Sequence, residues 1–145
     1  MKCYQKALEL GCRESEIQVH IATANFEENK DLGMVRELLR KSLAIENNAI
    51  AYRAMGKVEV TAKNYETAVR HYCDALKIEP FNFNTINRIG EIFYFNVKKM
   101  EKAIQYFTRY IQLNPYNAKV LTFIGLAFQE NQSLVEARDY YLKAL

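Results

Sequence analysis

The sequence predicts an all-α protein, an α-solenoid of stacked antiparallel helix pairs with about nine helices. Three observations predict this fold. Apolar residues step by three and four along the chain, which is the spacing of a helix with one buried face. A motif recurs at intervals of 34 and 35 residues. Turn residues are sparse, with only 5 glycines and 2 prolines in 145 residues, whereas β-sandwiches and barrels need a turn about every dozen residues.

Composition and charge are those of an ordinary globular protein. Half of the residues are apolar and 26% are charged, which excludes wholesale disorder. The net charge of +3 is too small to indicate a nucleic-acid partner. The 3 cysteines lack the spacing of a metal or redox site, so we expect reduced thiols and a cytoplasmic or nuclear protein that is not secreted. No apolar run is long enough to span a membrane, and the first residues do not form a signal peptide.

The repeated motif places a glycine four residues after a bulky residue. The three clear copies are Tyr52 and Gly56, Ile86 and Gly90, and Leu121 and Gly125. Twelve or thirteen residues after each glycine comes an alanine, followed four residues later by an aromatic side chain. These second pairs are Ala68 and Tyr72, Ala103 and Phe107, and Ala137 and Tyr141. Each copy therefore predicts two consecutive helices.

The repeats are expected to divide the chain into five parts. They are 1–14, a half repeat with only a second helix; 15–47, a divergent repeat; 48–81; 82–116, with a one-residue insertion; and 117–145, truncated at the end of its second helix. Residues that can cap a helix N-terminus precede the four first helices: Ser15, Asn48, Asn82 and Asn117. Pro80 and Pro115 are expected to end the helices before them. Because both ends leave apolar helix faces uncovered, we expect a segment of a longer array, or ends covered by another chain.

The glycines predict close packing within each helix pair. A glycine inside a helix costs about 1 kcal/mol relative to alanine, so three glycines at the same phase imply a contact that a side chain would prevent. We expect Ala68, Ala103 and Ala137 to face the glycines. The aromatic residues that follow these alanines are expected to fill the gap between one pair and the next.

These positions resemble the tetratricopeptide repeat family, whose helix–turn–helix unit has about 34 residues. In the best copy the matching residues are Tyr52, Gly56, Ala68, Tyr72, Ala75 and Pro80. The resemblance covers essentially the whole chain. It implies a right-handed superhelix that binds other proteins.

Two departures from the family pattern predict local differences. Glu59 replaces an aromatic residue, and we expect it to be partly exposed or hydrogen-bonded near Tyr52 or Lys63. An extra residue between Gly90 and Ala103 predicts a longer first helix in the third repeat, through Phe95 or Asn96.

The resemblance also implies that the first helices of successive repeats line a concave groove. The residues expected to bind a partner there are His20, Arg53, Lys57, Asn84, Asn87, Arg88, Glu91, Phe95, Lys119, Thr122, Phe123 and Leu126. The groove is basic in its first half and aromatic in its second. We therefore expect a peptide that carries acidic residues beside an apolar anchor. The alternative is that these residues are solvated helix faces.

No catalytic, cofactor-binding or metal-binding residue is expected. His71 and Cys73 are two residues apart on a predicted helix and point in different directions. No phosphate-binding loop or metal-spaced cluster is present in the sequence. We expect no membrane partner, and no nucleic acid either, because most tyrosines occupy core positions.

The function expected is therefore that of a non-enzymatic scaffold or adaptor. The main alternative is an assembly subunit joined through its open ends, where Tyr4, Leu8, Tyr141, Leu142 and Leu145 would be exposed. Residues 21–43 also resemble the half-a-tetratricopeptide repeats of RNA-processing scaffolds. The clamp that binds chaperone tails is a further alternative, but of the five residues that it requires only one is matched in this sequence, by Arg88.

Overall fold

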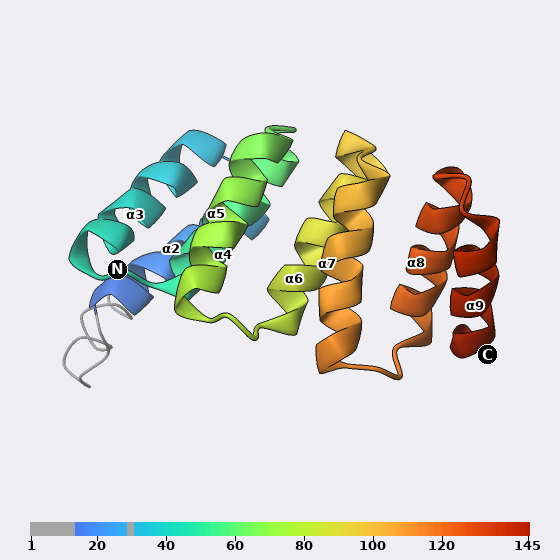
Figure 1. The fold of residues 1–145 in the computed structure, drawn as a ribbon. Coiled ribbons are helices and arrows are strands. Elements are labelled where there is room, and N and C mark those ends of the chain that lie inside the picture. The colour runs from blue at the N-terminus through green and yellow to red at the C-terminus, as the bar shows by residue number, and fades with distance from the viewer. Residues whose placement is uncertain (1–13, 29–30) are drawn as a thin grey trace. The chain divides into compact units, whose positions relative to one another are not determined.

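The computed structural model describes residues 14–28 and 31–145, and within them it contains eight α-helices, one π-helix and no strand (Figure 1). The all-α prediction is confirmed. Apart from Glu14, the half repeat expected in residues 1–14 lies outside the described residues, together with Tyr4 and Leu8.

The chain divides into two compact units, Met1–Glu79 and Pro80–Leu145. The described helices of the first unit are α2 (Glu14–Glu28), α3 (Leu32–Ile45), α4 (Ala49–Thr61) and α5 (Tyr65–Ile78). The second unit contains α6 (Phe83–Glu91), the π-helix η1 (Ile92–Val97), α7 (Met100–Leu113), α8 (Ala118–Glu130) and α9 (Leu134–Ala144).

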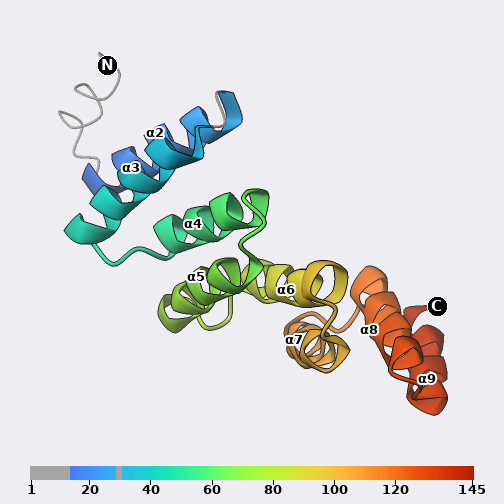
Figure 2. The same cartoon turned by 90° about the horizontal axis from the view of Figure 1, so that it is seen from above.

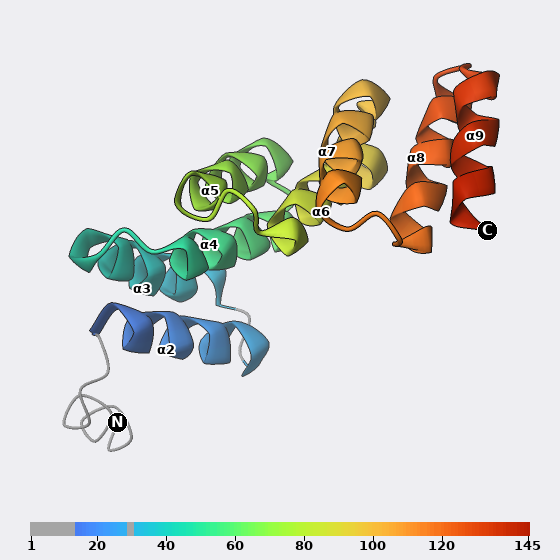
Figure 3. The ribbon, with the colours of Figure 1, turned by 60° about the horizontal axis from the view of Figure 1, so that its bottom comes forward.

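Within each unit, consecutive helices form pairs that pack on one another. In the first unit α2 contacts α3, α4 contacts α5, and α4 also packs against both α2 and α3 (Figure 2). In the second unit α6 contacts α7, α8 contacts α9, and α7 joins the two pairs (Figure 3). This arrangement is the stacking of helix pairs that the sequence predicts for a solenoid.

Short polar side chains start three of the helices as expected. The side-chain oxygens of Asn48, Asn82 and Asn117 accept hydrogen bonds from backbone N–H groups in the first turns of α4, α6 and α8. The prediction for Ser15 is wrong, because this residue lies inside α2. The prolines act as predicted: α5 ends at Ile78 and α7 at Leu113, each two residues before its proline.

The turns inside the helix pairs explain why α6 and η1 together form a longer helix than α4 or α8. Lys63, Lys98 and Gln132 occupy equivalent turn positions and all have φ near +60°, at 62°, 60° and 63°. The residue after each turn residue donates its N–H to a carbonyl of the preceding helix. Asn64 and Ser133 donate to carbonyls five residues back, whereas Lys99 donates to the carbonyl of Phe93, six residues back. The wider π-helical turn of η1 takes up the extra residue, so the predicted lengthening is confirmed, although the helix ends at Val97 and not at Phe95 or Asn96.

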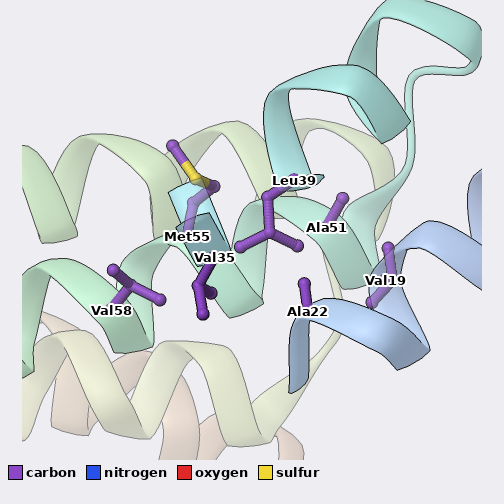
Figure 4. Packing of buried hydrophobic residues seen from close by; sticks show 7 residues of the cluster. All are labelled: Val19, Ala22, Val35, Leu39, Ala51, Met55 and Val58. Atoms are coloured by element: carbon purple, nitrogen blue, oxygen red, sulfur yellow. The ribbon is translucent and has the colours of Figure 1, made fainter. Parts of the chain in front are cut away.

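The core of the first unit is an aliphatic cluster. Its buried members come from α2, α3 and α4 and are Val19, Ala22, Val35, Leu39, Ala51, Met55 and Val58 (Figure 4). The core of the second unit is more aromatic, because Phe93, Tyr94, Phe107 and Tyr110 are all buried there.

Aromatic rings, rather than alanines, face the periodic glycines. A Cβ added to Gly56 would lie 2.7 Å from the Tyr72 ring, and one added to Gly90 would lie 2.6 Å from Phe107. Gly125 stands in the same relation to Tyr141, at 2.7 Å. The sequence correctly predicts a contact that excludes a side chain but assigns it to the wrong partner. The aromatic side chain is long enough to reach across the pair, whereas an alanine is not.

Glu59 is buried and paired with a residue far away in sequence. Arg36 of α3 donates to both carboxylate oxygens of Glu59, over 2.7 and 3.1 Å, and the Asn64 amide donates over 2.8 Å. Glu59 is therefore hydrogen-bonded as expected, but not to Tyr52 or Lys63. The Arg36 guanidinium holds the pKa of Glu59 below its ordinary value, and Glu59 raises the pKa of Arg36.

Candidate functional site

The predicted groove residues of the first unit lie on α2 and α4. His20 and Lys57 are exposed, and Arg53 is half-buried. The Arg53 guanidinium forms an ion pair with Glu79, so its charge is compensated within the unit. The Lys57 ammonium lies 5.3 Å from the centre of the Phe26 ring and has no ion-pair partner among the described residues. Lys57 is thus the more available cation on this face.

A small cavity opens beside Lys57, between α2, α3 and α4. Its volume is about 50 Å³. Its lining residues are Thr23, Phe26, Glu27, Val35, Leu39, Ala54, Lys57 and Val58. Sequence reasoning misses this cavity, although one signal was present: Ala54 is small where Phe123 is large at the same distance before a periodic glycine.

Polar residues on α6 of the second unit are bonded to one another. Glu91 accepts hydrogen bonds from the Asn87 amide over 3.0 Å and from the Arg88 guanidinium over 3.1 Å. Arg88 therefore carries a compensated charge, like Arg53. Asn84 is exposed, and the buried Oδ1 of Asn87 finds no hydrogen-bond donor in the described part of the chain.

An aromatic cluster joins η1 to α8. The rings of Phe95 and Phe123 meet edge to face, with centroids 5.4 Å apart, and Tyr94 lies against both. Phe95 remains 49% exposed. The Lys119 ammonium lies 5.8 Å from the centre of the Phe123 ring. An apolar side chain with a nearby carboxylate could pack on Phe95 and approach Lys119, and edge-to-face rings and a cation suit such a ligand.

The remaining predicted residues of α8 are on the edge of this cluster. Thr122 and Leu126 are half-buried, and the Thr122 hydroxyl donates to the Ala118 carbonyl over 2.8 Å. The structure thus brings together Phe95, Lys119 and Phe123 from the second half of the predicted set. We call Phe95, Phe123 and Lys119 the aromatic face.

Two titratable groups near these surfaces, His71 and Tyr94, have shifted pKa values that are explained by burial and by contacts within the protein. Burial lowers the pKa of His71, whose ring stacks on Tyr52 at 6.4 Å. Burial, with the hydrogen bond to Glu130, raises the pKa of Tyr94 to about 12. In residues 14–28 and 31–145, no group of three His, Cys, Asp or Glu residues could hold a metal ion. No helix in these ranges is long and apolar enough to cross a membrane.

The C-terminal helix α9 has an exposed apolar side. Leu134 and Leu142 are 68% and 60% exposed, and an open hollow of about 310 Å³ lies beside them. Its lining residues are Gln129, Leu134, Ala137, Arg138, Tyr141, Leu142 and Leu145. Tyr141 is half-buried there, because its ring packs against Gly125. Its hydroxyl donates a hydrogen bond to the side-chain oxygen of Gln129 over 2.9 Å.

Known proteins share both the repeat and the fold. The tetratricopeptide repeat family model matches residues 84–117. Superkiller protein 3 of Schizosaccharomyces pombe is 29% identical over an alignment of 100 residues, and the alignment covers 63% of this chain and 7% of that protein. The chain thus spans only a small part of that relative's length.

Crystal structures of MamA show the same fold. One has a TM-score of 0.82 at 19% identity and covers 99% of this chain and 83% of its own. A second, MamA AMB-1, has a TM-score of 0.79 at 25% identity and covers 90% of this chain and 71% of its own. Both agree with the helical solenoid expected from the sequence.

Proposed function

We propose that this chain, which belongs to the tetratricopeptide repeat family, is a non-enzymatic scaffold that binds a segment of a partner protein on its first-helix faces. The repeats would be 15–47, 48–81, 82–116 and 117–145. The binding residues would be the predicted set on α2, α4, α6, η1 and α8. The reduced state that the spacing of the cysteines predicts favours the cytoplasm or nucleus as its location.

The observation that carries this proposal is the aromatic face. Phe95 is half-exposed, yet it belongs to a cluster of four rings. The other three are Tyr94, Phe123 and Phe107, and Phe107 stacks on Phe123 with centroids 5.7 Å apart. An exposed ring held by other rings loses little conformational freedom when a ligand covers it. Aromatic anchors of this kind supply much of the energy of protein interfaces. Lys119 beside them favours an acidic partner segment.

A photo-cross-linking experiment tests the proposal. The photoreactive residue benzoylphenylalanine is placed at Phe95 and, as a matched control, at Phe81, which is 77% exposed but lies in the loop before α6. We expect a specific cross-linked partner from position 95 only, and loss of that product when Lys119→Glu is added. Equal products from both positions, or no effect of the charge reversal, would contradict binding at the aromatic face.

Assembly through α9 is a second candidate, favoured by the hollow beside Leu134 and Leu142. An apolar helix side of this kind can be covered by another subunit. Leu142→Lys separates the two functions. If assembly is the function, this variant lowers the mass measured by light scattering and leaves the cross-link at position 95 unchanged. If the scaffold alone is correct, the mass does not change.

A further inference from the structure

In the second unit, a ring from α8 fills the space beside the preceding helix pair. Phe123 stacks on Phe107 of α7, with centroids 5.7 Å apart, and lies 5.8 Å from Tyr94 of η1. Phe107 is completely buried. Aromatic side chains therefore occupy the joint between the pair α6–α7 and the helix α8.

The equivalent joint in the first unit lacks these rings. Ala54 lies two residues before Gly56, as Phe123 lies two residues before Gly125. In α3, Leu39 takes the position that Phe107 has in α7: Leu39 lies four residues after the buried Val35, as Phe107 lies four residues after the buried Ala103. Two large aromatic side chains are thus replaced by an alanine and a leucine. Protein interiors are close-packed, so a missing ring leaves space unless the helices move together.

The cavity between α2, α3 and α4 is this space. Its floor consists of Val35, Leu39 and Val58, which are 1%, 0% and 2% exposed and belong to the core cluster (Figure 4). Partly exposed Phe26 and Ala54 line its sides. The cavity therefore reaches from the predicted groove surface down to the hydrophobic core.

Its size decides what it can hold. At about 50 Å³ it is far smaller than the roughly 300–1,000 Å³ of small-molecule sites. It is about a third of the roughly 150 Å³ of an apolar cavity that holds a benzene ring. A branched aliphatic tip of two methyl groups fits this space, and a complete aromatic ring does not. An apolar floor also makes ordered water a poor occupant, because water needs polar partners.

Charge at the mouth of the cavity indicates what should flank the aliphatic group. Lys57 is exposed and forms no ion pair with Glu27, which lines the same cavity, or with any other described carboxylate. Its ammonium lies over Phe26 at the rim, 5.3 Å from the ring centre. A carboxylate next to the inserted side chain would find this cation without displacing an existing partner.

We propose that the cavity between α2, α3 and α4 is an anchor pocket for one Val, Ile or Leu side chain of a partner peptide, flanked by an acidic residue that pairs with Lys57. The inference deepens the proposed function, since it names a second binding point on the same scaffold. Phe123 fills the space between α7 and α8 in the second unit. The partner's aliphatic side chain fills the equivalent space in the first unit, but it comes from another molecule.

Methyl NMR of the whole chain tests the pocket directly. The probes are blocked pentapeptides Gly-Glu-X-Glu-Gly in which X is Ala, Val, Leu or Phe, together with Gly-Lys-Leu-Lys-Gly. We expect the Val and Leu peptides, at millimolar concentration, to shift the methyl signals of Val35, Leu39 and Val58. The Ala and Phe peptides should bind about tenfold more weakly, and the lysine-flanked peptide should also be weaker.

Two variants check the assignment. Ala54→Leu fills the pocket from within and should remove the methyl shifts while circular dichroism shows an unchanged helix content. Lys57→Gln should weaken the Glu-flanked peptide about threefold, whereas the matched control Lys63→Gln should not, because Gln132 already occupies the equivalent turn.

Several results would overturn the proposal. Absence of methyl shifts with the Leu peptide, equal binding of the Phe peptide, or unchanged binding to Ala54→Leu would each do so. A change in molecular mass caused by Ala54→Leu would indicate a second copy of this chain as the occupant instead. If position 95 cross-links no partner but the Leu peptide binds, the aromatic face fails and the pocket stands. If position 95 cross-links a partner but the Leu peptide does not bind, the pocket is rejected and the aromatic face stands.

Discussion

The contact between Gly90 and Phe107 can be tested by adding one methyl group. In Gly90→Ala, the new Cβ lies 2.6 and 2.7 Å from two atoms of the Phe107 ring. The first distance is about 0.8 Å less than the 3.4 Å at which ordinary van der Waals contact begins. The ring cannot move away freely, because it is fully buried and stacked on Phe123.

Two opposing effects set the expected magnitude. Replacing glycine by alanine inside a helix gains about 1 kcal/mol. Overpacking a buried contact costs about 1–3 kcal/mol, because side chains or backbone must shift. With a completely buried ring as the neighbour, we expect the upper part of this range and a net loss of about 1–2 kcal/mol in the free energy of unfolding.

Gly33→Ala is the matched control. Its new Cβ would meet only the Asp31 carboxylate, at 3.4 Å, which is an ordinary contact. The control should therefore stabilise the protein, by up to about 1 kcal/mol. Urea unfolding followed by circular dichroism compares the two variants, and hydrogen exchange of α6 and α7 amides locates the loss in Gly90→Ala. Gly56→Ala, in the same unit as Gly33, should also destabilise, since Tyr72 lies 2.7 Å from its new Cβ.

A double variant isolates the contact itself. Adding Phe107→Leu removes the ring that meets the new methyl group, so Gly90→Ala should cost less in that background than in the wild type. If Gly90→Ala stabilises the protein as Gly33→Ala does, or costs the same with and without the ring, the packing argument is wrong.

Three further predictions concern the ion pair and the turns. Arg36→Ala leaves Glu59 buried and should cost about 2 kcal/mol in urea unfolding, since the arginine side chain is 27% exposed; exposed Arg40→Ala should change stability by less than about 0.5 kcal/mol. Because the pKa of Glu59 is lowered in the folded state, its contribution to stability is complete above the unfolded value of about 4.3 and is lost as pH falls through the folded value. Glu59→Gln should remove that part of the acid dependence, and an unchanged pH profile would contradict the pairing. Lys98→Gly should raise the free energy of unfolding in urea by about 0.5–1 kcal/mol, because φ is 60° at this residue. A loss of stability would show that the backbone at this turn is not strained.

The sequence predicts the helices and their order because these depend on neighbours in the chain. Asn48, Asn82 and Asn117 cap their helices through bonds to backbone two or three residues away. The extra residue in the third repeat predicts the longer helix, although only the structure shows that a π-helical turn absorbs it. Ser15 fails as a cap because a capping residue type alone does not say where a helix begins.

The groove charges show what local reasoning leaves out. Arg53 and Arg88 look like available cations in the sequence, yet Glu79 and Glu91 compensate them. The Arg88 pair joins residues three apart and was visible in the helical spacing. The Arg53 pair joins residues 26 apart, so it depends on how α4 and the end of α5 meet. The pairing of Arg36 with Glu59 joins α3 to α4, which belong to different helix pairs, and follows from no sequence spacing.

The amino-acid order alone decided that the chain coils into paired helices, where α4, α6 and α8 begin, where α5 and α7 end, and that no side chain fits at three of its glycines. Those outcomes follow from hydrogen bonds and steric limits within one or two turns of the chain. Tertiary packing decided which ring covers each glycine, which carboxylate each arginine meets, and that Ala54 leaves a cavity where Phe123 fills one. Such partners are determined by how whole helices rotate and stack, because contacts between side chains distant in sequence exist only after the helices have packed.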